Sequence, residues 1–163
     1  MMKVFSNLYV GSQSDCFYDN KNDWIVIHAC KDPCHKYSVG YRGNLNKNHP
    51  NYLIKKMKNH LFLNMVDMNQ PLSHEYTEPI IITSLNFIEE NINQKNILIH
   101  CNLGFSRSPA LTLLFLAKRT NEISDKSYND AKNDFIKIYP NYRPRTGIEI
   151  YLKKYWDYVV TTR

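Results

Sequence analysis

Long apolar runs, a cleavable leader and a cysteine framework are all missing from this sequence of 163 residues. No stretch approaches the roughly 18 apolar residues that a membrane-spanning helix needs. Residues 1–11 also lack the apolar core of a signal peptide. Four cysteines are too few for a disulfide scaffold at this length, so we expect reduced thiols. Together these absences predict a cytoplasmic, intracellular protein without membrane contact.

Internal repeats, low-complexity tracts and linkers rich in proline, glycine or serine are absent as well. Residues 1–163 are therefore predicted to form a single domain. The 43% of hydrophobic residues and 22% of charged residues are ordinary for a folded domain and exclude a disordered chain. The formal net charge of +6 favours an anionic partner, but it does not distinguish a phosphate group from nucleic acid or an acidic membrane.

The hydrophobic pattern alternates between short apolar runs and segments with helical period. The runs predict strands at residues 8–10, 24–27, 61–63 and 96–99. Helices are expected around residues 81–92, 108–118, 128–138 and 148–159, the second of them apolar nearly all round. We therefore predict an α/β domain with a twisted, mostly parallel sheet of about four or five strands flanked by helices. The polar segment 31–59 is predicted to be a long excursion with one short helix at 52–58.

One junction carries a pattern typical of phosphate chemistry. The apolar strand at 97–99 runs into His100 and Cys101, and a buried helix begins after Arg107. The backbone N–H groups of such a loop converge on one point, and the helix N-terminus adds unpaired donors, so a phosphate fits there. Gly104 allows the loop to curl with positive φ, and Pro109 costs no needed donor in the first helical turn.

Each residue type in this loop suits one chemical role. The N–H dipoles and a nearby guanidinium favour the thiolate form of Cys101, which makes it a candidate nucleophile. The planar guanidinium of Arg107 can hold two phosphate oxygens at once. Ser108 can donate a hydrogen bond to the thiolate as it leaves. His100 is expected to brace the loop by hydrogen bonds to its backbone.

The combined spacing is specific. Histidine before the cysteine, with glycine three, arginine six and serine or threonine seven residues after it, is expected by chance only about 2 times in 100,000. The motif resembles that of the cysteine-dependent protein phosphatases, in particular the compact dual-specificity branch. Residues 7–11 and 144–147 are similar to the opening strand and to the turn before the last helix of that family. The resemblance implies a phosphocysteine intermediate, no metal and no cofactor, and a phosphate-binding loop formed by Asn102, Leu103, Gly104, Phe105, Ser106 and Arg107.

The resemblance also implies a general acid on a separate loop. In that family an aspartate lies some thirty residues before the nucleophile, and Asp67 lies 34 residues before Cys101, directly after the strand at 61–63. Such a group is needed because an unprotonated alkoxide leaves slowly, and the same carboxylate can then accept a proton from water. A solvated surface charge is the alternative interpretation of Asp67.

The substrate class follows from what the loop lacks. Asn102, Leu103, Phe105 and Ser106 are uncharged, whereas relatives that act on inositol lipids usually carry basic residues there. We therefore expect a phosphorylated protein or peptide as partner, with phosphotyrosine and also phosphoserine or phosphothreonine admitted. The alternatives are an RNA 5′-phosphatase or triphosphatase and a catalytically silent phosphate-binding module. Nucleic acid is not an expected partner, because the basic stretch at 55–58 lacks interleaved aromatic side chains.

The remaining thiols allow two further hypotheses. His28, Cys30, Cys34 and His35 lie close together in the sequence, but their spacing does not fit a zinc finger, so no metal is expected. Cys30 follows a strand whose carboxyl end should lie near that of the strand before Cys101. Cys30 is thus a candidate redox partner that forms a disulfide with oxidised Cys101. The resemblance also implies that the turn with Arg143 and Arg145 lies near the active site, so these arginines form either a second anion contact at the pocket rim or solvated surface charge.

Overall fold

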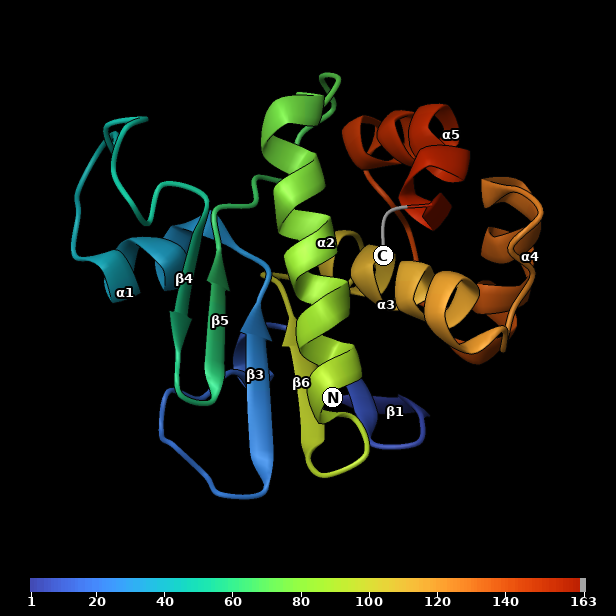
Figure 1. The fold of residues 1–163 in the computed structure, drawn as a ribbon, viewed down its shortest axis with the longest axis horizontal. Coiled ribbons are helices and arrows are strands. Elements are labelled where there is room, and N and C mark those ends of the chain that lie inside the picture. Colours follow the sequence, from blue (N-terminus) through green and yellow to red (C-terminus); the bar gives the residue numbers. More distant parts are fainter. Residues whose placement is uncertain (162–163) are drawn as a thin grey trace.

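The computed structural model describes residues 1–161, with side chains described as far as Val159. Its centre is a six-stranded sheet in the order β1-β2-β6-β3-β5-β4 (Figure 1). The strands span Met2–Phe5, Leu8–Gly11, Trp24–His28, Ile54–Met57, His60–Leu63 and Asn96–His100. The four inner strands are parallel to one another, and the two edge strands are antiparallel to their neighbours. The sheet is therefore mixed and mostly parallel, as predicted, but has more strands than the four or five expected.

Helices account for most of the chain after the fifth strand. The five α-helices are α1 (Lys36–Val39), α2 (His74–Asn91), α3 (Arg107–Phe115), α4 (Tyr128–Ile138) and α5 (Thr146–Thr161). Three shorter helical turns span Gln13–Asp15 (η1), Lys31–His35 (η2) and Leu116–Thr120 (η3). Helix α3 is central: every residue in it is buried, and it packs against α2, α4, β2 and β6. In Figure 1, α2 crosses in front of the sheet, while α1 lies beside β4, away from α4 and α5.

The four predicted strands and four predicted helices are confirmed, but the short helix expected at residues 52–58 is wrong. Residues 54–57 form the edge strand β4, which pairs antiparallel with β5, Ile54 opposite Leu63 and Met57 opposite His60. The polar, lysine-containing sequence of this segment, with Lys55 and Lys56, is compatible with an exposed helix. Edge strands also carry charged lysines, which prevent pairing with another chain. Strand β1 was missed because it is short and half exposed.

The parallel order brings three strand ends to one edge of the sheet. Strand β6 ends at His100, directly before the candidate phosphate loop, and its neighbour β3 ends at His28 in register with it. Strand β5, on the other side of β3, ends at Leu63 and leads into the loop that carries Asp67. In an open α/β sheet, ligands bind outside the carboxyl ends of the strands, so the fold places all three segments where a site is expected.

Candidate active site

The loop from Cys101 to Arg107 curls between β6 and α3, with the Cys101 side chain at its base. Cys101 is only 1% exposed, and its Sγ lies 3.2 Å from the Oγ of Ser108. The same hydroxyl lies 3.3 Å from the carbonyl oxygen of Gly11 in the neighbouring strand, so its hydrogen is positioned between the two acceptors. Gly104 has φ +76°, and a Cβ there would lie 3.0 Å from the Gly11 oxygen. Glycine is thus required at 104 by conformation and by space.

The guanidinium of Arg107 is held across the loop. Its Nη1 donates to the carbonyl oxygen of Met65 at 2.9 Å, and its Nη2 donates to Oδ1 of Asn102 at 2.6 Å. The Asn102 amide in turn donates to the carbonyl oxygen of Asp32 at 2.9 Å. Among residues 1–161 the buried Nε of Arg107 has no hydrogen-bond partner. A side chain buried and oriented in this way presents a charge-assisted donor to an anion in the loop.

The structure brings Asp67 to the same loop. Oδ1 of Asp67 accepts a hydrogen bond from the Ser106 hydroxyl at 2.8 Å, and Oδ2 lies 3.8 Å from Nε of Arg145. The Ser106 oxygen also accepts the backbone N–H of Arg145 at 3.0 Å. The carboxylate side chain is 21% exposed, so it is accessible to substrate as well as anchored. The spacing argument from the sequence therefore led to a residue that contacts the loop directly.

A turn near the C-terminal helix clamps the loop from outside. The backbone N–H of Arg143 donates to the Phe105 carbonyl at 2.8 Å, and the Tyr139 hydroxyl donates to the Gly104 carbonyl at 3.0 Å. Burial, reinforced by the neighbouring Cys101 charge, raises the pKa of Tyr139, so its hydroxyl remains a donor. Sequence reasoning placed the turn of Arg143 and Arg145 near the site but missed Tyr139, which the helical pattern presents as one more core residue.

The mouth of the loop is apolar. Leu103 is 63% exposed and Phe105 40% exposed, although both belong to a loop whose other members are buried or half-buried. On the facing loop, beside Asp67, Val66 is 43% exposed. A substrate that enters the loop therefore meets these apolar side chains, with the exposed Arg145 beside Asp67, around a strongly polar base.

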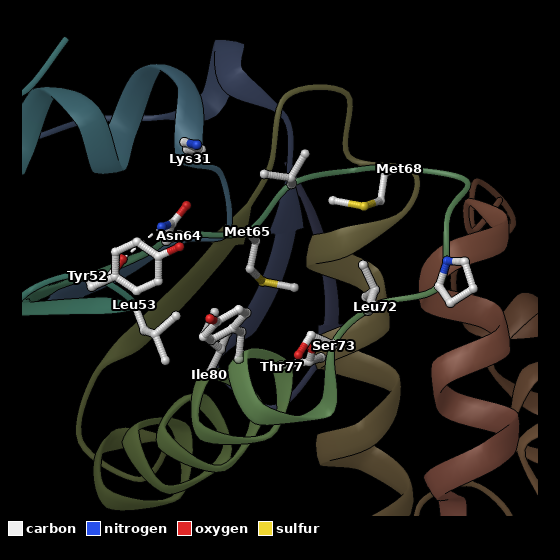
Figure 2. Close-up of a pocket in the computed structure, with 13 residues that line it drawn as sticks. Lys31, Tyr52, Leu53, Asn64, Met65, Met68, Leu72, Ser73, Thr77 and Ile80 are labelled. Atoms are coloured by element: carbon white, nitrogen blue, oxygen red, sulfur yellow. Dashed lines mark hydrogen bonds between the residues drawn. The ribbon is translucent and has the colours of Figure 1, made fainter. Parts of the chain in front are cut away.

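Behind the Asp67 loop lies a separate pocket of about 340 Å³ (Figure 2). Met65 and Val66 form the wall on the side of the loop, and Tyr76 and Ile80 of α2 line the opposite side. Figure 2 shows the chain from Asn64 to Met68 passing over this pocket, with the Met65 side chain directed into it. Cys101 does not line it. The pocket is adjacent to the candidate acid but is not the place of the chemistry.

Two predicted residues have surroundings that differ from the sequence expectation. The ring of His100 does not hydrogen-bond to the loop backbone: its Nε2 lies 2.8 Å from Nδ1 of His28 and 3.9 Å from Sγ of Cys34. His100 therefore contacts the neighbouring strand β3 and η2, and the expectation that it braces the loop backbone is wrong. Cys30 lies in a small buried cluster with Cys34 and Phe62, whereas Cys101 belongs to the main core. A disulfide between Cys30 and Cys101 stays a prediction.

No helix within residues 1–161 combines the length and the apolar character needed to cross a bilayer.

Comparison with known proteins identifies the family. The sequence profile of "Dual specificity phosphatase, catalytic domain" matches residues 25–147. The chain is 31% identical over 137 residues to "Dual specificity protein phosphatase YVH1" of Plasmodium falciparum; this match covers 81% of the chain but only 22% of that protein. The fold is similar to a human tyrosine phosphatase-like serine/threonine/tyrosine-interacting protein (TM-score 0.65, 17% identity, 98% and 97% of the two chains). It is also similar to the crystal structure of DUSP15, with a TM-score of 0.63 and 18% sequence identity. This match covers 96% of the present chain and 86% of DUSP15. The chain belongs to the dual specificity phosphatase catalytic domain family.

Proposed function

We propose that residues 1–163 form one catalytic domain that hydrolyses phosphate monoesters of phosphoproteins through a phosphocysteine intermediate. The observation that carries the proposal is the convergence of three groups on one loop. Cys101 lies at its base, Arg107 spans it, and Asp67 is anchored to its Ser106. A silent phosphate-binding module would need Arg107 but would have no use for a carboxylate held beside the loop.

In the first step the Cys101 thiolate attacks phosphorus, and the bond between phosphorus and the substrate oxygen breaks. Protonated Asp67 donates its proton to that oxygen, so a neutral alcohol or phenol leaves. Loop N–H groups and the Arg107 guanidinium stabilise the negative charge of the transferring phosphoryl group. The product of this step is phosphocysteine and a dephosphorylated hydroxyl.

In the second step water attacks the phosphocysteine, and the sulfur–phosphorus bond breaks. Asp67, now ionised, accepts the proton of the water, and inorganic phosphate forms. The electron pair returns to the sulfur of Cys101, where the Ser108 hydroxyl at 3.2 Å donates to the developing thiolate. The enzyme is thereby restored without a metal at the reacting atoms.

The substrate class is supported by the apolar side chains at the rim. Leu103, Phe105 and Val66 are exposed around the loop, so the rim offers apolar contact to the side chain or backbone of a phosphopeptide. A polyphosphorylated headgroup would require further cations at those positions. We assign the domain to phosphotyrosine, phosphoserine and phosphothreonine in proteins, and to a reducing compartment, the cytoplasm, because the chemistry needs a free Cys101 thiol.

Hydrolysis of a small aryl phosphate by wild type, Cys101→Ser and Asp67→Asn tests the proposal under reducing conditions. Phosphotyrosine and phosphothreonine peptides and an RNA 5′-triphosphate are assayed in parallel. We expect activity on both peptides, none for Cys101→Ser, and a loss of about 10²- to 10⁴-fold for Asp67→Asn. An inactive wild type, or full activity of Cys101→Ser, would overturn the proposal. If the RNA 5′-triphosphate were hydrolysed and the phosphopeptides were not, the proposed phosphoprotein substrate would be wrong and an RNA substrate would take its place.

A further inference from the structure

Four potential metal ligands from four separate segments converge beneath the phosphate loop. Cys16 follows η1, His28 ends β3, Cys34 lies in η2 and His100 ends β6. One donor atom from each of the four lies within 4.8 Å of each of the others. The two histidines are paired in register on adjacent parallel strands, which places their rings at the same edge of the sheet. The turns after β2 and β3 then bring the two thiols to these rings.

Three separations between the donor atoms can be compared with those of a tetrahedral site. Sγ of Cys16 lies 3.5 Å from Nδ1 of His28, which lies 2.8 Å from Nε2 of His100, and that atom lies 3.9 Å from Sγ of Cys34. Around a zinc ion with bonds of about 2.3 Å to sulfur and 2.0–2.1 Å to nitrogen, neighbouring ligand atoms are about 3.3–3.8 Å apart. All four donor atoms lie within 4.8 Å of one another, so side-chain shifts of up to about 1 Å would bring them into this range.

The surroundings already hold the ligands in orientation. His28, Cys34 and His100 are 0% exposed. Nε2 of His28 lies 3.1 Å from Nδ1 of His60, and its ring stacks on Phe62 with 4.2 Å between ring centroids. At His28 this hydrogen bond at the far ring nitrogen fixes the tautomer and the direction of the ligating nitrogen, as is usual around a metal-bound histidine. Among residues 1–161, Nδ1 of His100 has no such partner.

We propose that Cys16, His28, Cys34 and His100 form a tetrahedral zinc site. On binding, the two thiols release their protons to solvent and the two imidazoles bind through neutral nitrogens, so two thiolates balance the Zn²⁺ charge. No electron is transferred. Thiolate and imidazole ligands in a closed, buried tetrahedron suit Zn²⁺ better than Mg²⁺ or Ca²⁺, which prefer oxygen ligands. The site has no open position, so its role is structural.

Such a site would fix the base of the phosphate loop from two sides. His100 directly precedes Cys101, so the ion would hold the end of β6 at the point where the loop begins. Asp32, two residues before Cys34, accepts a hydrogen bond from Asn102 through its carbonyl oxygen. The metal would thus position the loop without touching a substrate, and the inference stands independently of the proposed phosphatase reaction.

The sequence alone did not identify this set. It suggested His28, Cys30, Cys34 and His35, which are close in the chain, and their spacing argued against a metal. In the structure the ring of His35 instead contacts the Tyr41 hydroxyl at 3.1 Å and the Asn51 carbonyl at 2.9 Å. The two replacements, Cys16 and His100, are distant in sequence and meet the others only through the sheet order.

Metal content tests the proposal in the purified full chain. The wild type is prepared under reducing conditions, dialysed against metal-free buffer and analysed by inductively coupled plasma mass spectrometry, and the apo form is titrated with Co²⁺. We expect about one Zn²⁺ per chain and the intense visible bands of tetrahedral, thiolate-bound Co²⁺. Cys34→Ser and Cys16→Ser should weaken Zn²⁺ binding at least tenfold. Cys30→Ser is the matched control, since Cys30 is an equally buried thiol next to Cys34 and should leave the stoichiometry unchanged.

X-ray absorption of the Zn²⁺-loaded wild type provides a measurement that does not depend on whether a variant folds. We expect two sulfur neighbours at about 2.3 Å and two nitrogen neighbours at about 2.0–2.1 Å. A wild type that binds neither Zn²⁺ nor Co²⁺ overturns the proposal. So does a shell without sulfur, a disulfide among these thiols under reducing conditions, or a Cys30→Ser variant that loses the metal as fully as Cys34→Ser.

Discussion

Ser106 donates a hydrogen bond of 2.8 Å to the carboxylate of Asp67, and this bond joins the two loops that carry the candidate catalytic residues. The second oxygen of Asp67 lies at the longer distance of 3.8 Å from Nε of Arg145. The hydroxyl therefore positions the candidate acid relative to the phosphorus that Cys101 would attack. The relationship is a property of the fold before any substrate binds.

Ser106→Ala should impair the acid without removing it. Because the carboxylate loses its anchor but keeps its proton, we expect kcat to fall about tenfold with a phosphoserine peptide, whose alkoxide needs protonation. An aryl phosphate with a good leaving group should be slowed much less. Steady-state kinetics with both substrates measures the difference, and Asp67→Asn serves as the more severe reference. An equal loss on both substrates would contradict the positioning role.

Ser108→Ala should slow the second half of the reaction. The hydroxyl lies 3.2 Å from the sulfur that must leave as a thiolate, so its loss should lower the rate of phosphocysteine hydrolysis by about tenfold. Rapid-quench kinetics with an aryl phosphate should then show a burst of phenol close to one equivalent. Ser108→Thr keeps the hydroxyl and should restore turnover. If Ser108→Ala showed no burst of phenol, Ser108 would have no role in phosphocysteine hydrolysis.

Gly147→Ala should displace the loop that carries Asp67, although position 147 lies on another element, α5. A Cβ at position 147 would lie 2.4 Å from the carbonyl oxygen of Gln70 and 2.5 Å from that of Met68, so the backbone next to Asp67 must move. We expect a loss of about 1–3 kcal/mol in the free energy of unfolding, measured in urea, together with a lower kcat. Gly40→Ala is the control: its φ of +87° makes alanine costly there, but nothing lies within 4 Å, so kcat should be unchanged. Unchanged kcat in Gly147→Ala would contradict the coupling.

The loop between β6 and α3 could be proposed from sequence as a phosphate site because its pattern is local. Strand, cysteine, glycine, arginine and helix start follow one another within a dozen residues, and Asp67 needed only its distance from Cys101. What depends on the order of the strands could not be predicted in this way. The pairing of His28 with His100 across β3 and β6 determines where their rings lie. The hydrophobic pattern of each strand does not show which other strand it pairs with. Edge strand β4 was mistaken for a helix for the same reason, because it is a strand only through its antiparallel pairing with β5.

Lys118 makes the free energy of unfolding depend on pH, and one substitution can isolate this contribution. Its ammonium nitrogen lies 3.8 Å from the centroid of the Trp156 ring and donates to the Asp125 carbonyl at 3.3 Å. Burial lowers the pKa of Lys118 to about 8, against the weaker opposing effect of the Asp125 and Asp157 charges. Between about pH 8 and the unfolded value near 10.4, the unfolded chain binds more protons than the native one, so this lysine makes stability rise with pH.

Lys118→Met should remove this rise in stability. Urea unfolding of both proteins at pH 7.5 and pH 9.5 measures it, and we expect the wild type to gain about 2 kcal/mol relative to the variant over this interval. Tyrosines such as Tyr128 and Tyr151, whose pKa values burial raises, act in the opposite direction at higher pH, but they are common to both proteins and cancel in the difference. The same substitution at exposed Lys58 is the control. A difference between wild type and Lys118→Met that does not change with pH would mean that the native state holds this ammonium group at no electrostatic cost.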